Sequence, residues 1–324
     1  MFDSKRILII DQLNLFFRNY IVNPSLSSNG SPIGGLKGCF QSIQKICRES
    51  KPDLIVICWD GAGGSKKRKL MKKDYKAGRK PIRLNRSIRN MPEEKETENK
   101  IWQQTRLIEY YNQTPIIQFM FAGTEADDII AYISQFKELN NSEKLIISSD
   151  KDFFQLLNEK TVQYRPVQKE ILNENSILDK FNIHPANFAI ARAMEGDKSD
   201  NIEGIAGLGL KTIAKRFPFL RESKSTTFSD VLDFCKEKSV TTNIKAYQMV
   251  LENEDLFKRN YHMMQLYTPS LSVDAKKLIR ETFRDPDLTF NKTELIKMMM
   301  KDGFGEINFI DLFQNFNRIS IDNR

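Results

Sequence analysis

The sequence predicts an α/β fold in which helices flank a mostly parallel central sheet, followed by a region that is mostly helical. Apolar runs of strand length alternate with segments of helical spacing up to about residue 157. Such an alternation is typical of parallel strands whose connecting helices cover both faces of a sheet. Beyond about Asn173, strand-like runs become rare and helical segments dominate. We therefore expect an α/β domain over residues 1–173 and a helical region over residues 174–324.

Each expected strand is a short apolar run, and a helical segment or a turn follows it. The strands are expected at residues 6–10, 54–59, 115–121 and 144–148, with a peripheral hairpin at 162–164 and 170–172. The helices are expected at residues 36–49, 98–112, 124–139 and 150–157, where apolar side chains recur at helical spacing. In the third helix Thr124 is the expected N-cap and Asp127 the third helical position, as in a capping box.

Composition indicates a soluble protein with a core. Of the 324 residues 40% are hydrophobic and 28% are charged. No apolar run approaches the roughly 20 residues that span a bilayer, so no membrane association is expected. The four cysteines show no C-x-x-C spacing, and we expect reduced thiols and a cytoplasmic location. The sequence gives no sign of an oligomer, and a monomer is expected.

Positive charge is concentrated in one strip of the chain. Residues 65–91 hold twelve Lys or Arg residues and one acid, a net +11, which leaves about −3 for the rest of a chain whose net charge is +8. A basic strip on a neutral-to-acidic body is typical of nucleic-acid-binding proteins, although a solvated loop could have the same composition. We expect this strip, over about residues 62–97, to be mobile without a ligand. Its expected nucleic-acid-binding residues are Lys66, Lys67, Arg68, Lys69, Lys72, Lys73, Lys80, Arg83 and Arg86.

Nine acidic residues lie in five short motifs, and four of these motifs fall just after strand-like runs. They are Asp11, Asp60, Glu125, Asp127, Asp128, Asp150, Asp152, Asp197 and Asp200. The carboxyl ends of parallel strands meet at one edge of a sheet, so these carboxylates should converge. Single motifs have simpler explanations, such as acids that complement a helix N-terminus or an aspartate that caps a helix. Nine negative charges in one place, however, require cations.

The expected cations are two Mg²⁺ ions, for which Mn²⁺ could substitute. Mg²⁺ binds through one or two carboxylates and keeps several waters, so some of the nine acids would act through water. A two-metal site suits phosphodiester hydrolysis, because one ion lowers the pKa of a water and both ions stabilise charge on the attacking and leaving oxygens.

A glycine-rich motif follows the last pair of acids. It reads Gly204-Ile-Ala-Gly207-Leu-Gly209-Leu-Lys211-Thr212 and lies within an expected helix-hairpin-helix, or helix-three-turn-helix, over about residues 186–216. Glycines allow the backbone to approach a phosphate, and amides at the next helix N-terminus can bind it. A glycine-rich turn between packed helices is the simpler alternative.

Taken together, these motifs resemble those of the 5′ nucleases over about residues 5–215. This family includes flap endonucleases, the 5′ nuclease domain of bacterial DNA polymerase I, and the RNase H of T-even bacteriophages, which the chain resembles most in size. Ile-Ile-Asp11, Trp-Asp60-Gly, Tyr75-Lys76 and the other acidic motifs follow in the family's order.

The resemblance implies a PIN-like 5′ nuclease core that holds two Mg²⁺ ions. It also implies that the basic strip forms a helical arch, through or under which a 5′ single strand passes. It implies that Lys76 is the catalytic lysine, that Tyr75 and Arg79 are further catalytic residues, with Arg79 as a supporting phosphate contact, and that a K⁺ ion is held at the helix-hairpin-helix. The implied activity is 5′→3′ hydrolysis of RNA–DNA and DNA duplexes and of flaps, with removal of RNA primers during DNA replication. The implied location is the host-cell cytoplasm if the protein is viral.

Partner and function alternatives stay open at this stage. Leu312-Phe313 is similar to peptides that bind a sliding clamp, although an amphipathic helix packed on the body is favoured. A single-strand DNA-binding protein is a further expected partner. The alternative functions are a PIN-type ribonuclease and a non-catalytic nucleic-acid-binding protein of the same fold.

Overall fold

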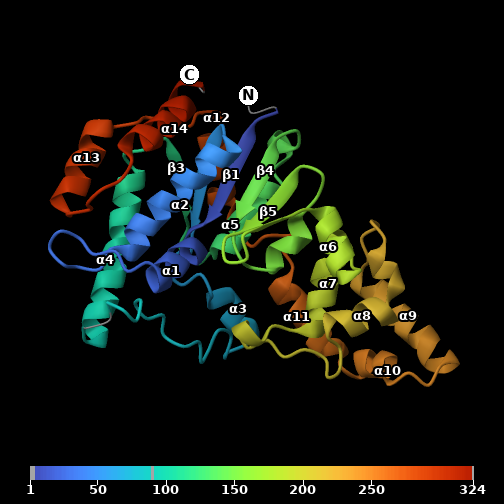
Figure 1. Cartoon of the computed structure of the whole chain (residues 1–324). Coiled ribbons are helices and arrows are strands. Elements are labelled where there is room, and N and C mark those ends of the chain that lie inside the picture. Colours follow the sequence, from blue (N-terminus) through green and yellow to red (C-terminus); the bar gives the residue numbers. More distant parts are fainter. Residues whose placement is uncertain (1–3, 89–90, 323–324) are drawn as a thin grey trace.

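A six-stranded sheet forms the centre of the molecule, in the order β3-β2-β1-β4-β5-β6 (Figure 1). The computed structural model describes residues 4–88 and 91–322. The strands are β1 (Arg6–Asp11), β2 (Leu54–Trp59), β3 (Ile116–Met120), β4 (Glu143–Ile147), β5 (Thr161–Arg165) and β6 (Glu170–Leu172). The first five strands run parallel, and β6 pairs antiparallel with β5. The expected peripheral hairpin is therefore formed by β5 and β6 at one edge of the sheet, and β5 also extends the parallel ladder beside β4.

The central strands are buried on both faces. Every residue of β2 is buried, and so are the last five residues of β1. The ladder pairs Ile10 of β1 with Ile57 of β2 and with Ile147 of β4. These three strands therefore end at nearly the same level, and the residues that follow them lie at one edge of the sheet.

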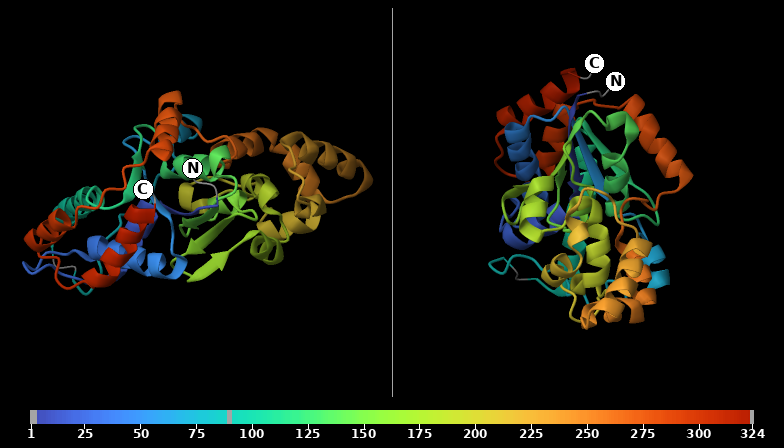
Figure 2. Two further views of the ribbon diagram at one scale, coloured as in Figure 1. Left: turned by 90° about the horizontal axis from the view of Figure 1, so that it is seen from above. Right: turned by 90° about the vertical axis from the view of Figure 1, so that its right-hand side faces the viewer.

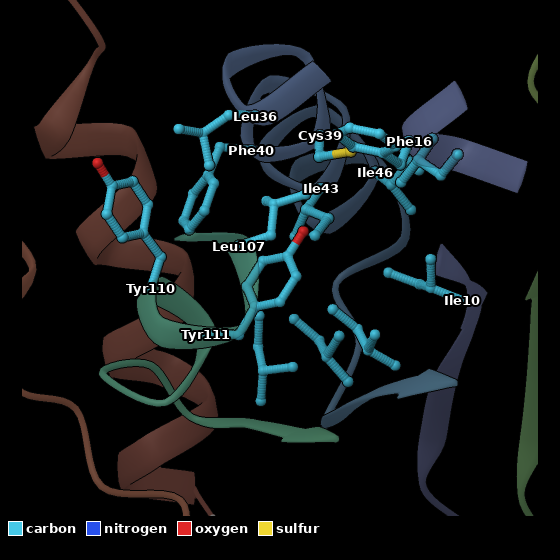
Figure 3. Packing of buried hydrophobic residues seen from close by; sticks show 14 of the residues in the cluster. Ile10, Phe16, Leu36, Cys39, Phe40, Ile43, Ile46, Leu107, Tyr110 and Tyr111 are labelled. Atoms are coloured by element: carbon cyan, nitrogen blue, oxygen red, sulfur yellow. The ribbon is translucent and has the colours of Figure 1, made fainter. Parts of the chain in front are cut away.

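One face of the sheet is covered by α1 (Gln12–Val22), α2 (Gly34–Ser50) and α4 (Glu93–Tyr111). Figure 3 shows side chains of α2 and α4 packed together over this face. The rings of Phe40 and Tyr111 stack with their centroids 5.2 Å apart. Burial of large aromatic side chains such as these contributes much of the stability of a core.

The opposite face is covered by α5 (Ala126–Ser134) and α12 (Val273–Arg284). Phe119 of β3 stacks with Phe283 of α12 at a centroid distance of 6.2 Å. The sheet is thus enclosed on both faces, as the sequence predicted for a parallel sheet.

Six helices form a separate region beside the sheet, visible at the right of Figure 1 and in both views of Figure 2. They are α6 (Glu174–Phe181), α7 (Pro185–Glu195), α8 (Leu210–Arg216), α9 (Phe228–Thr241), α10 (Lys245–Glu252) and α11 (Glu254–Met264), with the 3-10 turn η4 (Pro218–Arg221) between α8 and α9. Their core is joined to the sheet by the 3-10 turn η2 (Asp152–Leu156), whose Phe154 contacts Phe188 of α7 at a ring-centroid distance of 5.3 Å.

The chain returns to the α/β domain after α11, which corrects the expected domain boundary. Besides α12, the helices α13 (Lys292–Lys301) and α14 (Phe309–Asp322) contribute to the core over the α2 face. Figure 1 shows α14 beside α2, although the two are far apart in sequence. Only residues 174–264 form the separate helical region. The sequence could not show this, because an amphipathic helix reveals its apolar face but not the surface that the face covers.

Two helices at the ends of central strands also differ from the prediction. The unpredicted α1 follows β1 without a loop, and its N-cap is Asp11, which accepts a hydrogen bond from the amide of Asn14 at 3.2 Å. The expected helix over 150–157 is only the 3-10 turn η2.

The helix expected over 124–139 is shorter. It begins at Ala126 with Glu125 rather than Thr124 as N-cap, so Asp127 takes the second helical position. The capping box does not form, and Asp60 instead accepts a hydrogen bond from the amide of Ala126 at 2.6 Å. After Ser134 the chain leaves the helix, and a separate 3-10 turn, η1 (Lys137–Leu139), follows.

All four cysteines are free and buried, as expected for reduced core thiols. Among the helices that the structure describes, none has the length and apolar character needed to cross a membrane.

Candidate metal centre and nucleic-acid interface

The candidate site lies at the edge of the sheet where β1, β2 and β4 end. Asp11 is the last residue of β1, Asp60 directly follows β2, and Asp150 lies three residues after β4. Because these strands are neighbours in the sheet, three distant parts of the sequence bring acidic residues to one edge. The charges of Asp60 and Asp150 act there on the carboxyl group of Asp11.

Asp11 is only 8% exposed, and both of its carboxyl oxygens accept hydrogen bonds. The hydroxyl of Ser148 donates to one of its oxygens at 2.8 Å, and the amide of Asn14 donates to the other. The pKa of Asp11 is raised to about 7, mainly by burial and then by the charges of Asp60 and Asp150, although the hydrogen bond from Ser148 lowers it. The sequence analysis did not single out Ser148, because a serine beside an acid carries no signal of its own.

Three further carboxyl groups have raised pKa values for the same reasons. Burial and the neighbouring charge of Asp150 hold the pKa of Asp127 well above its usual range. Burial likewise raises the pKa of Asp150, and that of Asp152 to about 7. Negative charges that lie near one another with little solvent around them destabilise one another. A cation would therefore stabilise the charged forms of these carboxyl groups.

Two positively charged side chains of the basic strip pair with Glu125, in the acidic motif that follows β3. Glu125 is 1% exposed and accepts hydrogen bonds from Lys76 Nζ at 2.8 Å and from Arg68 at 2.7 Å. Arg68 also donates to Asp128 at 3.1 Å. The hydroxyl of Tyr75 lies 3.3 Å from Glu125 and donates to it. Burial alone would raise the pKa of Glu125, but Arg68 and Lys76 outweigh it and hold this pKa below its usual value.

The helical region supplies another buried cation, Arg192 of α7. Its guanidinium donates to Asp152 at 3.3 Å and to Glu195 at 2.6 Å, and it pairs with Asp197. Burial would raise the pKa of Asp197, but hydrogen bonds from Ser199 and the charge of Arg192 lower it. The sequence analysis missed Arg192, because an arginine in the last turn of a helix is common and its carboxylate partners are brought to it only by folding.

The strip is anchored to the last pair of acids as well. Arg79 pairs with Asp200, and the backbone carbonyl of Asp200 accepts a hydrogen bond from the amide of Lys76 at 2.9 Å. Tyr75 and Leu84 are buried, so the strip covers more apolar surface than its composition suggested. It is folded against the site and is not a loop solvated throughout.

The predicted helical arch is helical only in part. Among its described residues, α3 (Lys66–Met71) precedes turns and extended chain, and α4 begins at Glu93. Six of the predicted basic residues are exposed to solvent, namely Lys66, Lys67, Lys69, Lys73, Lys80 and Arg86. Lys72 is half-buried and pairs with Asp74, whereas Arg83 pairs with Glu96 at 2.6 Å. Arg68 differs from these residues, because only 12% of its side chain is exposed and it pairs with Glu125 and Asp128.

The structure also allows a test of whether these residues suit divalent metal ions. Within the described ranges, no three His, Cys, Asp or Glu side chains lie close enough together to ligate one ion. Arginine and lysine side chains lie between the carboxylates instead. The donor chemistry nevertheless fits Mg²⁺, which prefers oxygen ligands. Burial is the main cause of the raised pKa values of Asp11, Asp127 and Asp150, and the charges of neighbouring acids add to it, so a divalent cation would stabilise their charged forms.

Two packed helices and a glycine-rich turn lie where the helix-hairpin-helix was predicted. The turn joins α7 to α8 and includes the 3-10 turn η3 (Lys198–Asp200). A Cβ atom at Gly204 would lie 1.8 Å from the carbonyl oxygen of Glu195, so only glycine fits there. Gly207 has φ +79° and Gly209 is the N-cap of α8, both in open space. Lys211 is exposed and Thr212 is half-buried on the first turn of α8.

Comparison with known proteins decides the family. The model of the "5'-3' exonuclease, N-terminal resolvase-like domain" matches residues 6–182, more than half of the chain. The chain belongs to the 5′-3′ exonuclease family. Members of this family are hydrolases, and the protein is a nuclease of this family.

Relatives and solved structures agree with this assignment. The chain is 26% identical over 317 residues to a 5′-3′ exonuclease of Aquifex aeolicus, covering 94% of this chain and 96% of the relative. It is 30% identical over 264 residues to the flap endonuclease Xni of a Shewanella species, covering 81% and 90%. A bacteriophage T5 flap endonuclease, solved in a pseudo-enzyme–product complex with DNA and metal ions, has the same fold, with TM-score 0.65 and 19% identity over 97% of this chain and 100% of that one.

The C-terminal helix α14 of this 5′ nuclease packs on the body of the protein, as the sequence analysis favours. Leu312 is fully buried, and the ring of Phe313 lies 5.3 Å from that of Phe290 and 5.4 Å from that of Phe309. The Leu-Phe pair is thus part of an amphipathic helix on the body, and it is not free to enter the groove of a clamp.

Proposed function

We propose that this member of the 5′-3′ exonuclease family is a Mg²⁺-dependent nuclease that acts near the 5′ ends of flaps, nicked duplexes and RNA-primed duplexes. The observation that carries the proposal is the meeting of the strand-end carboxylates with Lys76 of the basic strip at one edge of the sheet. By this proposal its task is the removal of RNA primers and adjacent DNA from newly replicated strands. The resemblance to the T-even RNase H supports this role.

The carboxylates are proposed to hold two Mg²⁺ ions, or Mn²⁺ in their place. The proposed inner ligands are Asp11, Asp60, Glu125, Asp128 and Asp150, whereas Asp127, Asp152, Asp197 and Asp200 complete the set, some of them through water. When bound, the ions would lower the pKa of an attacking water and offset charge on the phosphate oxygens. Because Arg68 and Lys76 now pair with Glu125, the proposal requires these side chains to share that carboxylate with an ion.

Lys76 is proposed to stabilise the negative charge that develops on the scissile phosphate. Burial would lower its pKa, but the charges of Asp127 and Glu125 outweigh burial and raise the pKa, so the ammonium stays protonated. Its Nζ atom lies 5.0 Å from the centre of the Tyr75 ring. Tyr75 is buried and its hydroxyl donates to Glu125, so its proposed role is to support Lys76. Arg79 is half-exposed and is proposed as a second phosphate contact.

Duplex binding is proposed to involve the exposed lysines of the strip and the glycine-rich turn before α8. Gly204, Gly207, Gly209, Lys211 and Thr212 would grip phosphates of the downstream duplex, with a K⁺ ion held by backbone carbonyls as the resemblance implies. A complex with a single-strand DNA-binding protein, a monomeric state and a cytoplasmic location stay predictions. The buried Leu312 speaks against the clamp contact.

The test is a cleavage assay on a 5′-labelled flap and on a 5′-RNA-primed duplex, with Mg²⁺ and with EDTA. We expect short 5′ products that require Mg²⁺, and a loss of rate of about 10²–10³-fold in Lys76→Ala. Lys80→Ala is the matched control: this exposed lysine should affect DNA affinity but not the rate at saturating DNA. Intact binding without cleavage of either substrate would refute the proposal in favour of a binding protein. Cleavage of free single-stranded RNA without a duplex would favour a PIN-type ribonuclease.

A further inference from the structure

We propose that Arg68 is a positioning residue, which sets the carboxylates of Glu125 and Asp128 relative to the helical region, and that it does not contact nucleic acid. The inference rests on the proposed function, since it concerns carboxylates of the same site. It separates Arg68 from its neighbours in α3, to which the sequence assigns the same basic character.

The surroundings of Arg68 differ from those of the other cations of α3. Only 12% of its side chain is exposed, whereas Lys66, Lys67 and Lys69 are exposed. Its Nη1 atom donates to Glu125 Oε2 at 2.7 Å and to Asp128 Oδ2 at 3.1 Å. A phosphate would have to displace two buried carboxylates to reach this guanidinium.

The third partner of Arg68 lies in the helical region. Its Nε atom donates to the carbonyl oxygen of Met263, near the end of α11, at 2.9 Å. Just beyond α11, the amide of Ser270 donates to Asp128 Oδ1 at 2.8 Å, and Lys67 donates to the hydroxyl of Ser270 at 2.7 Å. Each oxygen of Asp128 therefore has a partner, one from the basic strip and one from the segment after α11.

This set of contacts needs an arginine. The planar guanidinium can donate to two carboxylates and a carbonyl at the same time, whereas a lysine ammonium is a point charge on a flexible stem. Glu125 is the N-cap of α5, and Asp128 lies in the first turn of that helix. By holding both carboxylates and the end of α11, Arg68 ties the orientation of the proposed ligands to the position of the duplex-binding helices. An error of about 1 Å in such a site can cost about 10²-fold in rate.

Two substitutions separate positioning from a phosphate contact, because the two roles predict different results. For positioning, Arg68→Lys should lower kcat at saturating Mg²⁺ and saturating flap DNA at least tenfold, although the charge is kept. Arg68→Gln should lower kcat as much, while the slope of log affinity against log salt, measured in EDTA on the same flap DNA, stays at the wild-type value. For a phosphate contact, Arg68→Lys would be close to wild type, and Arg68→Gln would reduce the slope by about one.

Lys69→Gln is the matched control on the same helix. Because Lys69 is exposed, this variant should reduce the slope of log affinity against log salt.

A purely structural role would lower the melting temperature of the Arg68 variants but leave kcat unchanged below that temperature. The proposal is overturned if Arg68→Lys retains the wild-type kcat, or if Arg68→Gln reduces the salt slope. If Arg68→Gln does not fold, Arg68→Lys decides alone. A wild-type enzyme without Mg²⁺-dependent cleavage would instead refute the proposed function, and the salt slope of Arg68→Gln would still decide whether this residue contacts DNA.

Discussion

Replacing Asp11 with asparagine tests the electrostatics of the carboxylate cluster in the absence of metal. The pKa of Asp11 is raised from 3.8 to about 7, mainly by burial and by the charges of Asp60 and Asp150. That rise corresponds to about 4 kcal/mol against the charged form in the folded state. Asparagine removes the charge but weakens the hydrogen bonds with Ser148 and Asn14, which are worth about 1 kcal/mol each. We therefore expect Asp11→Asn to stabilise the protein by about 2 kcal/mol in EDTA at pH 8.

The effect has a defined dependence on pH. An acid whose pKa is raised on folding destabilises the folded state above its ordinary pKa, because the unfolded chain loses the proton more readily. The electrostatic gain from Asp11→Asn should therefore be absent below pH 3.8, grow as the pH rises, and be complete above about pH 7. With Mg²⁺ present the order should reverse, because the wild type would gain stability from ions that the variant holds less well.

The assay is thermal unfolding in EDTA at pH 5 and at pH 8; for a chain of 324 residues, about 2 kcal/mol at pH 8 corresponds to a rise of about 3 °C in the melting temperature. Asp128→Asn is the matched control. Both oxygens of Asp128 have partners, Arg68 and the amide of Ser270, so this variant should lose stability by about 3 kcal/mol. A lower melting temperature for Asp11→Asn at pH 8 in EDTA would refute the reasoning, because the hydrogen bonds of Asp11 would then outweigh the repulsion.

Three further predictions concern buried groups. Arg192→Gln leaves Asp152 and Asp197 without the guanidinium that pairs with them. The free energy of unfolding measured in urea should therefore fall by about 3–5 kcal/mol, and an unchanged unfolding midpoint would contradict this. Burial lowers the pKa of Lys144 from 10.5 to about 8, which corresponds to about 3 kcal/mol against the charged form. Lys144→Met should therefore add about 2 kcal/mol at pH 7, because about 1 kcal/mol is lost with the hydrogen bond from Lys144 Nζ to the carbonyl oxygen of Ser142. This gain should fade as the pH rises from 8 to 10.5, and a gain independent of pH would exclude titration as its cause. Leu312→Ala should cost about 2–5 kcal/mol in the same unfolding measurement, whereas a cost below about 1 kcal/mol would mean that α14 is not part of the core.

The central sheet and the position of the site were predictable from the sequence. The strand expected at residues 54–59 has the same bounds in the structure, because a strand buried on both faces appears as an uninterrupted apolar run. The convergence of Asp11, Asp60 and Asp150 followed from a general property of parallel strands, whose carboxyl ends lie at one edge. The starts of α1 and α5 were harder to predict, since Asp11 and Asp60 accept the hydrogen bonds of their first turns.

Tertiary structure alone decided which cation meets which acid and where the last helices pack. Arg68 and Lys69 are neighbours in a run of like residues, but a helix turns by about 100° per residue, so one lies between two carboxylates and the other faces solvent. Likewise, the apolar stripes of α12 and α14 indicate that something covers them, and only the folded chain shows that it is the sheet and α2. The sequence determines which side chains must be buried or paired, because that depends on local chemistry. The choice of partner depends on contacts between distant segments, which form only when the chain folds.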